Sequence, residues 1–83
     1  MIRLPLYQRV ALSRDVAQHG FRRGDVATLV DYVPHPAGGP DGCVLEVFNA
    51  LGESLVVITV SVTDIEPLEA DEILSVRHFA GAR

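Results

Sequence analysis

The chain has few or none of several residue types that would point to specialised chemistry. It contains no lysine and no tryptophan, a single cysteine, and only 6% aromatic residues. All seven basic residues are arginine, and eleven acids outnumber them to give a formal net charge of −4. Because sequence-independent binding to nucleic acid depends on many cations that neutralise phosphates, this balance disfavours nucleic acid as a partner.

The single cysteine and the short apolar runs exclude further classes. Cys43 cannot form an internal disulfide, and it has no second thiol at metal-ligand spacing. Residues 1–8 lack the apolar core of a signal peptide, and the longest apolar stretch, near residues 55–60, is too short to cross a bilayer. We therefore expect a cytoplasmic protein with no membrane contact and no metal or other cofactor.

What the chain does contain is typical of one small folded domain. Apolar residues make up 48% of it and charged residues 22%, a balance unlike that of disordered chains. A chain of 83 residues has room for a single core. We expect one domain over residues 1–83, with an ordered barrel at 6–77, a flexible loop at 34–42 and a frayed tail at 79–83.

Glycine and proline divide the chain into short β-prone segments. Gly20 and Gly24 can adopt the positive φ values of a sharp reversal, so we expect a turn before Asp25. The proline- and glycine-rich residues 34–42 exclude both helix and interior strand. Strands are predicted at residues 9–12, 25–33, 43–49 and 54–61. A single helical turn is predicted at residues 62–65, capped by Thr63 or Asp64, before Pro67 ends it.

The last strand is assigned to residues 72–77, although the composition of this segment also suits a short helix. Five short strands, with a polar loop after the first and a helical turn before the last, predict an all-β fold. We expect a small five-stranded SH3-like barrel with a single helical turn before the last strand. An open β-sandwich is the competing geometry.

Several weak motifs gain force from their order along the chain. They are Leu6-Tyr7, Val10-Ala11-Leu12, Gly20, the run from Arg23 to Val30, Glu46-Val47-Phe48, Gly52-Glu53, Asp64-Ile65-Glu66-Pro67, and the run from Glu72 to Arg77. Together they resemble the small bacterial proteins catalogued as domain of unknown function 4926. The resemblance covers residues 6–77 and implies an SH3-like barrel with no established activity and no catalytic residues. The loop at 34–42 is longer and richer in proline than in that family.

The middle strands carry more large apolar side chains than one small barrel interior can hold. Since side chains alternate along a strand, Val44 and Phe48 share the outward face of Glu46. Residues 55–60 have no polar face, so either of their two alternating sets could turn outward. We predict an interface with a protein partner or a second copy, formed by Val44, Phe48, Val56, Ile58 and Val60. The alternative is that the tail from residue 68 to 79 covers these side chains within one chain.

No group of residues has the spacing of a catalytic site. His19 and Asp15 could form an acid–base pair, but a histidine in a turn is usually solvated or capping. Cys43 begins an apolar strand, where we expect a buried core residue rather than a nucleophile. His35 and His78 have no carboxylate or thiol nearby at ligand spacing. We therefore predict that the protein is not an enzyme and has no small-molecule substrate.

Three arginines form the one local basic feature. Arg22 and Arg23 lie on the glycine-bounded turn, and Arg14 lies in the loop before it. Their guanidinium groups are candidate contacts for a carboxylate or a phosphate. The alternative is that they serve solubility and pair within the chain with Asp15 or Asp25.

Two classes of function remain after these exclusions. The first is a non-catalytic protein-interaction module that self-associates or docks on a partner protein, as an accessory or antitoxin-like neutralising subunit. The second is a nucleic-acid- or ribosome-associated barrel, because SH3-like folds also occur in translation and transcription factors. With no lysine and few arginines, the chain lacks the basic stripe that the second class uses, so we favour the first.

Overall fold

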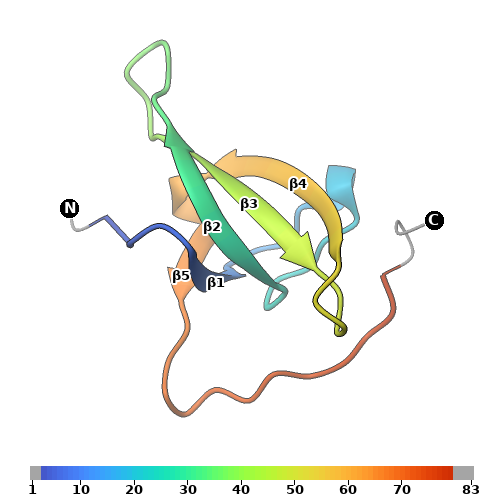
Figure 1. Cartoon of the computed structure of the whole chain (residues 1–83). Coiled ribbons are helices and arrows are strands. Elements are labelled where there is room, and N and C mark those ends of the chain that lie inside the picture. Colours follow the sequence, from blue (N-terminus) through green and yellow to red (C-terminus); the bar gives the residue numbers. More distant parts are fainter. Residues whose placement is uncertain (1–2, 80–83) are drawn as a thin grey trace.

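The computed structural model describes residues 3–79, which form a single antiparallel sheet of five strands (Figure 1). The only helices in this range are two short 3-10 turns, and neither is long or apolar enough to cross a membrane. The strands are β1 (Gln8–Leu12), β2 (Val26–Val33), β3 (Gly42–Phe48), β4 (Ser54–Ser61) and β5 (Ile65–Pro67). The 3-10 turns are η1 (Ala17–His19) and η2 (Val62–Asp64).

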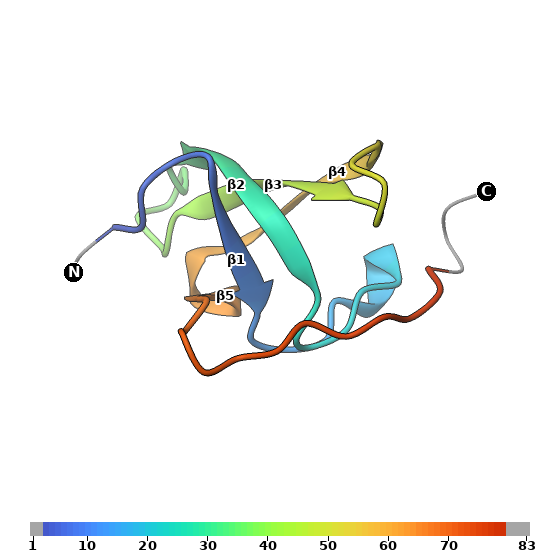
Figure 2. The same ribbon diagram turned by 60° about the horizontal axis from the view of Figure 1, so that its bottom comes forward.

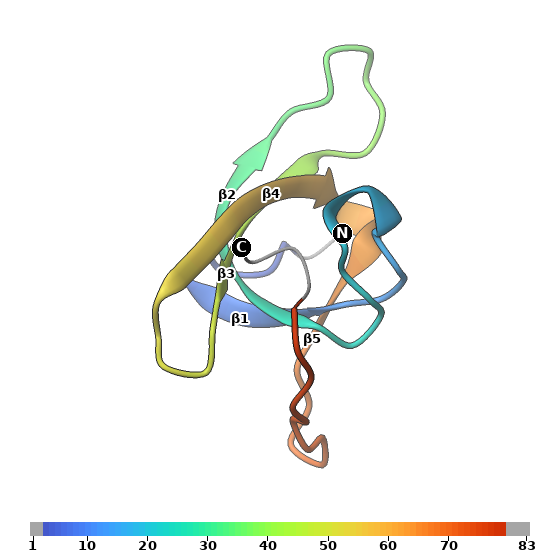
Figure 3. The same ribbon diagram turned by 90° about the vertical axis from the view of Figure 1, so that its right-hand side faces the viewer.

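The strand order β4-β3-β2-β1-β5 confirms the predicted SH3-like barrel with one helical turn before the last strand. β1 lies between β2 and β5 in this order. Val10 of β1 lies opposite Ala27 of β2 on one side and Pro67 of β5 on the other. The sheet curves round on itself, and the loop between β2 and β3 projects beyond it (Figure 3).

The core is built from one face of this curved sheet. Leu29, Leu45 and Ile58 lie opposite one another on β2, β3 and β4, and all three are buried. Because successive side chains point to opposite faces, their neighbours along each strand turn outward. Full burial of each such side chain contributes about 1.5–3 kcal/mol, so this row fixes the register of the three strands.

The loop between β1 and β2 covers one end of the core with Val16 and Phe21, both of which are buried. The backbone of these two residues forms an isolated β-bridge around η1, and Gly20 ends η1 with a φ of 75°. A left-handed φ of this kind strains any residue with a side chain, which explains the glycine. Gly24 also has a positive φ, of 91°, and the Asp25 N–H donates a hydrogen bond to the Arg22 carbonyl, which confirms the predicted reversal before Asp25.

The predicted helical turn before the last strand is η2, but its N-cap is Ser61 rather than Thr63 or Asp64. The Ser61 hydroxyl accepts a hydrogen bond from the Thr63 N–H, and the Asp64 carboxylate accepts one from the Ser61 N–H. This reciprocal pair is a capping box. It turns the chain sharply from β4 into β5.

The prediction of a fifth strand at residues 72–77 is wrong. The last strand is β5, because the chain leaving η2 meets the free edge of β1 at once, with Ile65 opposite Leu12. The barrel strands therefore end at residue 67, and residues 68–79 form an extended C-terminal segment below β1 (Figures 1 and 2). Phe79 was assigned to a frayed tail, but its ring stacks on Phe21 with centroids 4.7 Å apart. Residues 80–83 lie outside the described residues.

Candidate functional site

The outer face of the β3–β4 hairpin is unusually apolar, and part of it is exposed. Phe48 is 41% exposed and Val57 is 55% exposed, whereas Val44 beside them is partly buried. Leu51, in the turn that joins the two strands, is almost fully exposed. We call Phe48, Leu51 and Val57 the hairpin patch. The outward orientation predicted for Val44 and Phe48 agrees with the burial of Leu45 and Val47 between them.

The prediction that Val56, Ile58 and Val60 face outward is wrong. Ile58 is 2% exposed and Val60 is 7% exposed, both within the core, and Val56 packs against that core. Register explains the difference, because these three side chains lie opposite core residues of β3, namely Val47, Leu45 and Cys43. The outward set on β4 therefore includes Val57 and Thr59.

Leu55 belongs to the same alternating set as Val57 but does not join the hairpin patch. Val56 pairs with Val47, and Ser54 pairs with Phe48, so Leu55 has no partner of its own. This extra residue is a β-bulge, which locally redirects a strand. Leu55 accordingly packs against the core, and the patch contains only one side chain from β4.

The C-terminal segment does not cover the hairpin patch in the part of the chain that the structure describes. Its anchoring contacts are with the β1–β2 loop, where Arg77 donates a hydrogen bond from Nε to Asp25 Oδ1 at 2.9 Å and Phe79 stacks on Phe21. The segment also exposes its own apolar side chains, with Ile73 93% exposed and Val76 91% exposed. The fold therefore leaves two separate apolar regions without cover.

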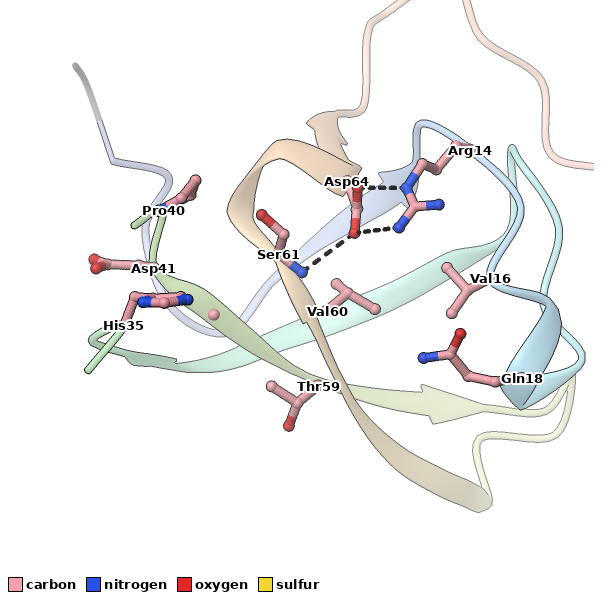
Figure 4. Close-up of a pocket in the computed structure, with 11 residues that line it drawn as sticks. Arg14, Val16, Gln18, His35, Pro40, Asp41, Thr59, Val60, Ser61 and Asp64 are labelled. Carbon is pink, nitrogen blue, oxygen red and sulfur yellow. Dashed lines mark hydrogen bonds and ion pairs between the residues drawn. The ribbon is translucent and has the colours of Figure 1, made fainter. Parts of the chain in front are cut away.

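A second candidate is a groove of about 450 Å³ between the β1–β2 loop, the β2–β3 loop and β4 (Figure 4). One wall is an ion pair in which Arg14 Nε lies 2.6 Å from Asp64 Oδ1. The opposite wall holds His35 and Asp41. Unlike the hairpin patch, this groove is lined largely by polar side chains.

The ionisable groups of the groove are already satisfied by partners within the chain. The hydrogen bond and charge of Arg14 lower the pKa of Asp64, which also receives the Ser61 N–H. Asp41 pairs with Arg3, and the Nδ1 of His35 accepts a hydrogen bond from the Ala37 N–H. Since Asp64 is a structural cap, the groove offers neither a free general base nor a free anion-binding cation.

The three arginines predicted as anion contacts have different environments. Arg14 is bound by Asp64. The Asp25 and Asp15 carboxylates accept the backbone N–H groups of Arg22 and Arg23, respectively. No carboxylate among residues 3–79 forms an ion pair with the guanidinium groups of Arg22 and Arg23, which remain exposed.

The structure also shows the environment of each residue considered for catalysis. Cys43 is fully buried, as the sequence predicts, and burial raises the pKa of its thiol, so it does not present a reactive thiolate. His19 is exposed at the end of η1, and its suggested partner Asp15 is bound to the Arg23 backbone. Within the described range, no three His, Cys, Asp or Glu side chains are grouped as metal ligands.

The docking of Arg77 and Phe79 on the barrel could not be found from local spacing, because their partners lie more than fifty residues away. Partial burial alone would raise the pKa of Asp25, but the hydrogen bonds from Arg77 and from the Arg22 N–H lower it overall. The only signal in the sequence is an arginine and an aromatic residue at the end of an otherwise acidic segment.

Comparisons with models of known families, with curated proteins and with solved structures found no match for the chain.

Proposed function

We propose that this chain is a non-catalytic protein-interaction module that docks on a partner protein through the hairpin patch. The observation that carries the proposal is the exposure of Phe48 and Val57 on the β3–β4 hairpin. The C-terminal segment of the chain is anchored on the β1–β2 loop instead of on this hairpin. Exposed large apolar side chains that gather on one face are typical of protein contacts. The polar groove is the weaker candidate, since its charged groups already have partners.

Covering the hairpin patch would contribute favourable energy to a contact with a partner. Full burial of a side chain such as Phe or Val contributes about 1.5–3 kcal/mol, and the isolated chain leaves roughly half of this unused at Phe48 and Val57. A partner that covers both side chains gains that energy, and an aromatic residue at the centre of a contact is a common hot spot.

The small size of the chain and its acidic character fit an accessory or antitoxin-like neutralising subunit, which acts by occupying the surface of another protein. The formal net charge of −4 would steer such a chain towards a basic partner. Membership in the family catalogued as domain of unknown function 4926 stays a prediction from the order of the motifs.

Affinity purification of the tagged chain from its source cells tests this proposal. Phe48→Asp places a charge in the hairpin patch, and Gln18→Asp places the same charge beside the groove. We expect the first variant to lose a partner that the wild type retains, and the second to retain it. Circular dichroism on both variants verifies that the barrel is folded.

Loss of the partner with Gln18→Asp and not with Phe48→Asp would move the site to the groove. Recovery of the same proteins by all three baits would contradict a role for either region.

A further inference from the structure

The C-terminal segment, residues 68–79, has a feature that the hairpin patch lacks, which is unpaired backbone. The segment is held at both ends, by β5 on β1 and by Arg77 and Phe79 on the β1–β2 loop. Between these anchors residues 73–76 belong to no helix or strand and run as a drawn-out chain (Figure 2), and within the described chain they form no backbone hydrogen bond to another residue. An extended segment that is already ordered in this way is ready to pair with another strand.

One side of the segment is free for such pairing (Figure 2). Because side chains alternate along an extended chain, the contacts of Arg77 and Phe79 with the barrel place Val76 and His78 on the opposite side. By the same alternation Leu74, which is 52% exposed, lies on this free side, and Ile73, which is 93% exposed, lies on the other side without cover from the barrel. The free side therefore presents two apolar residues, Leu74 and Val76, between Glu72 and His78.

We propose that this segment pairs with the same segment of a second copy of the chain, antiparallel about a two-fold axis at Ser75. The axis sets Ser75 opposite itself, Leu74 opposite Val76, and Glu72 opposite His78. Directly opposed side chains interact across an antiparallel pair, so this register matches apolar with apolar and acid with imidazole. A register centred on Leu74 would instead place the Glu72 carboxylate against Val76.

Charge selects a second copy in this antiparallel orientation. Four exposed acids precede the apolar residues, namely Glu66, Glu69, Asp71 and Glu72. Arg77 and His78 follow them. In the register centred on Ser75, antiparallel pairing sets Glu72 of each copy opposite His78 of the other, whereas parallel pairing would oppose each acid with itself. The segment is therefore complementary to itself, and the inference deepens the proposed function by naming a second interaction surface.

Sedimentation velocity on the purified full chain tests the pairing. Across a concentration series we expect a species with twice the 9.0 kDa mass of one chain. Val76→Asp, at a position 91% exposed, should reduce the mass to that of a monomer without unfolding the barrel. Val57→Lys, in the hairpin patch, is the matched control and should remain a dimer.

Cysteine cross-linking tests the register. Copies of Ser75→Cys face each other with Cβ atoms about 4.5–5.5 Å apart, close to disulfide geometry, and should cross-link on oxidation by air. Copies of Ile73→Cys are offset by four residues along the strands, about 13 Å, and should not. The native Cys43 is fully buried and serves as the background control.

A monomeric wild type, a dimer that survives Val76→Asp, or cross-linking of Ile73→Cys without Ser75→Cys would each overturn the pairing. A dimer lost only in Val57→Lys would overturn the pairing too, but it would place self-association on the hairpin patch and so support the proposed function. If the wild-type chain is monomeric but still captures a partner that Phe48→Asp loses, the pairing is overturned and the proposed function stands.

Discussion

The two faces of the β3–β4 hairpin carry similar side chains in opposite environments. Ile58 and Val57 are neighbours on β4, yet the first is 2% exposed and the second 55% exposed. The inner face is fixed by its register against Leu29 and Leu45, whereas the outer face has no cover within the described chain. The inner face therefore supplies the stability of the barrel, and the outer face is available to a partner.

The largest expected effect on stability comes from the inner face. Leu45→Ala removes a fully buried side chain at the centre of the core and should lower the free energy of unfolding by about 2–5 kcal/mol. Urea denaturation measures this change. Val57→Ala is the matched outer-face control, and an equal loss there would erase the distinction between the two faces.

The next largest effect is expected at the end of the hairpin, where β4 turns into η2. Asp64→Ala removes the Arg14 ion pair and half of the capping box, for a loss of about 0.5–2 kcal/mol in thermal denaturation. Arg14 is largely exposed, so its loss of a partner leaves no buried charge. Thr63→Ala, which keeps the carboxylate, is the control and should have the smaller effect.

Acid titration tests the contribution of the same carboxylate, Asp64, to stability. The pKa values of Asp64 and Asp25 are lowered in the folded state, relative to an unfolded value of about 3.9. Their contribution to stability is therefore complete above that value and disappears as the pH falls through the folded pKa values. We expect Asp64→Ala to flatten the loss of stability at acid pH, and an unchanged acid limb would contradict the role given to Asp64.

A smaller effect is expected where the C-terminal segment meets the barrel. Arg77→Ala removes the ion pair with Asp25, and hydrogen exchange should show faster exchange in residues 68–79 with little change in β2 and β3. The cost to global unfolding should stay within about 1 kcal/mol, because both partners are partly solvated. Simultaneous loss of protection in the core strands would show that the segment is part of the barrel.

The smallest effect on stability is expected on the outer face. Val57→Lys places a cation opposite Glu46 on β3, so the change in unfolding free energy should stay within about 0.5 kcal/mol. Calorimetry measures the stability of this variant beside the wild type. A loss comparable to that of Leu45→Ala would mean that Val57 serves the fold rather than a contact.

Local sequence signals were sufficient for most of the barrel. Glycine and proline marked the turns, alternation marked β3, β-branched residues marked β4, and the polar residues after Ser61 marked η2. The last strand was misplaced because Glu66 and Pro67 locally indicate the end of an element. In the structure, pairing with the free edge of β1 makes residues 65–67 the last strand. A proline is tolerated at such an edge.

The candidate site was predicted only in part. Alternation about Glu46 correctly turned Phe48 outward, but β4 is apolar on both sides, so its own pattern contained no signal for direction. Only the register against Leu45 resolves that choice. The docking of Arg77 on Asp25 depends on contacts across 52 residues, which no local pattern encodes.

Photo-cross-linking in the source cell tests whether the hairpin patch contacts a partner protein. A photoreactive residue replaces Val57 in the hairpin patch in one strain and Gln18 beside the groove in another. We expect a discrete protein adduct from position 57 and none from position 18. An adduct only from position 18, or no adduct from position 57 in a folded chain, would contradict this contact.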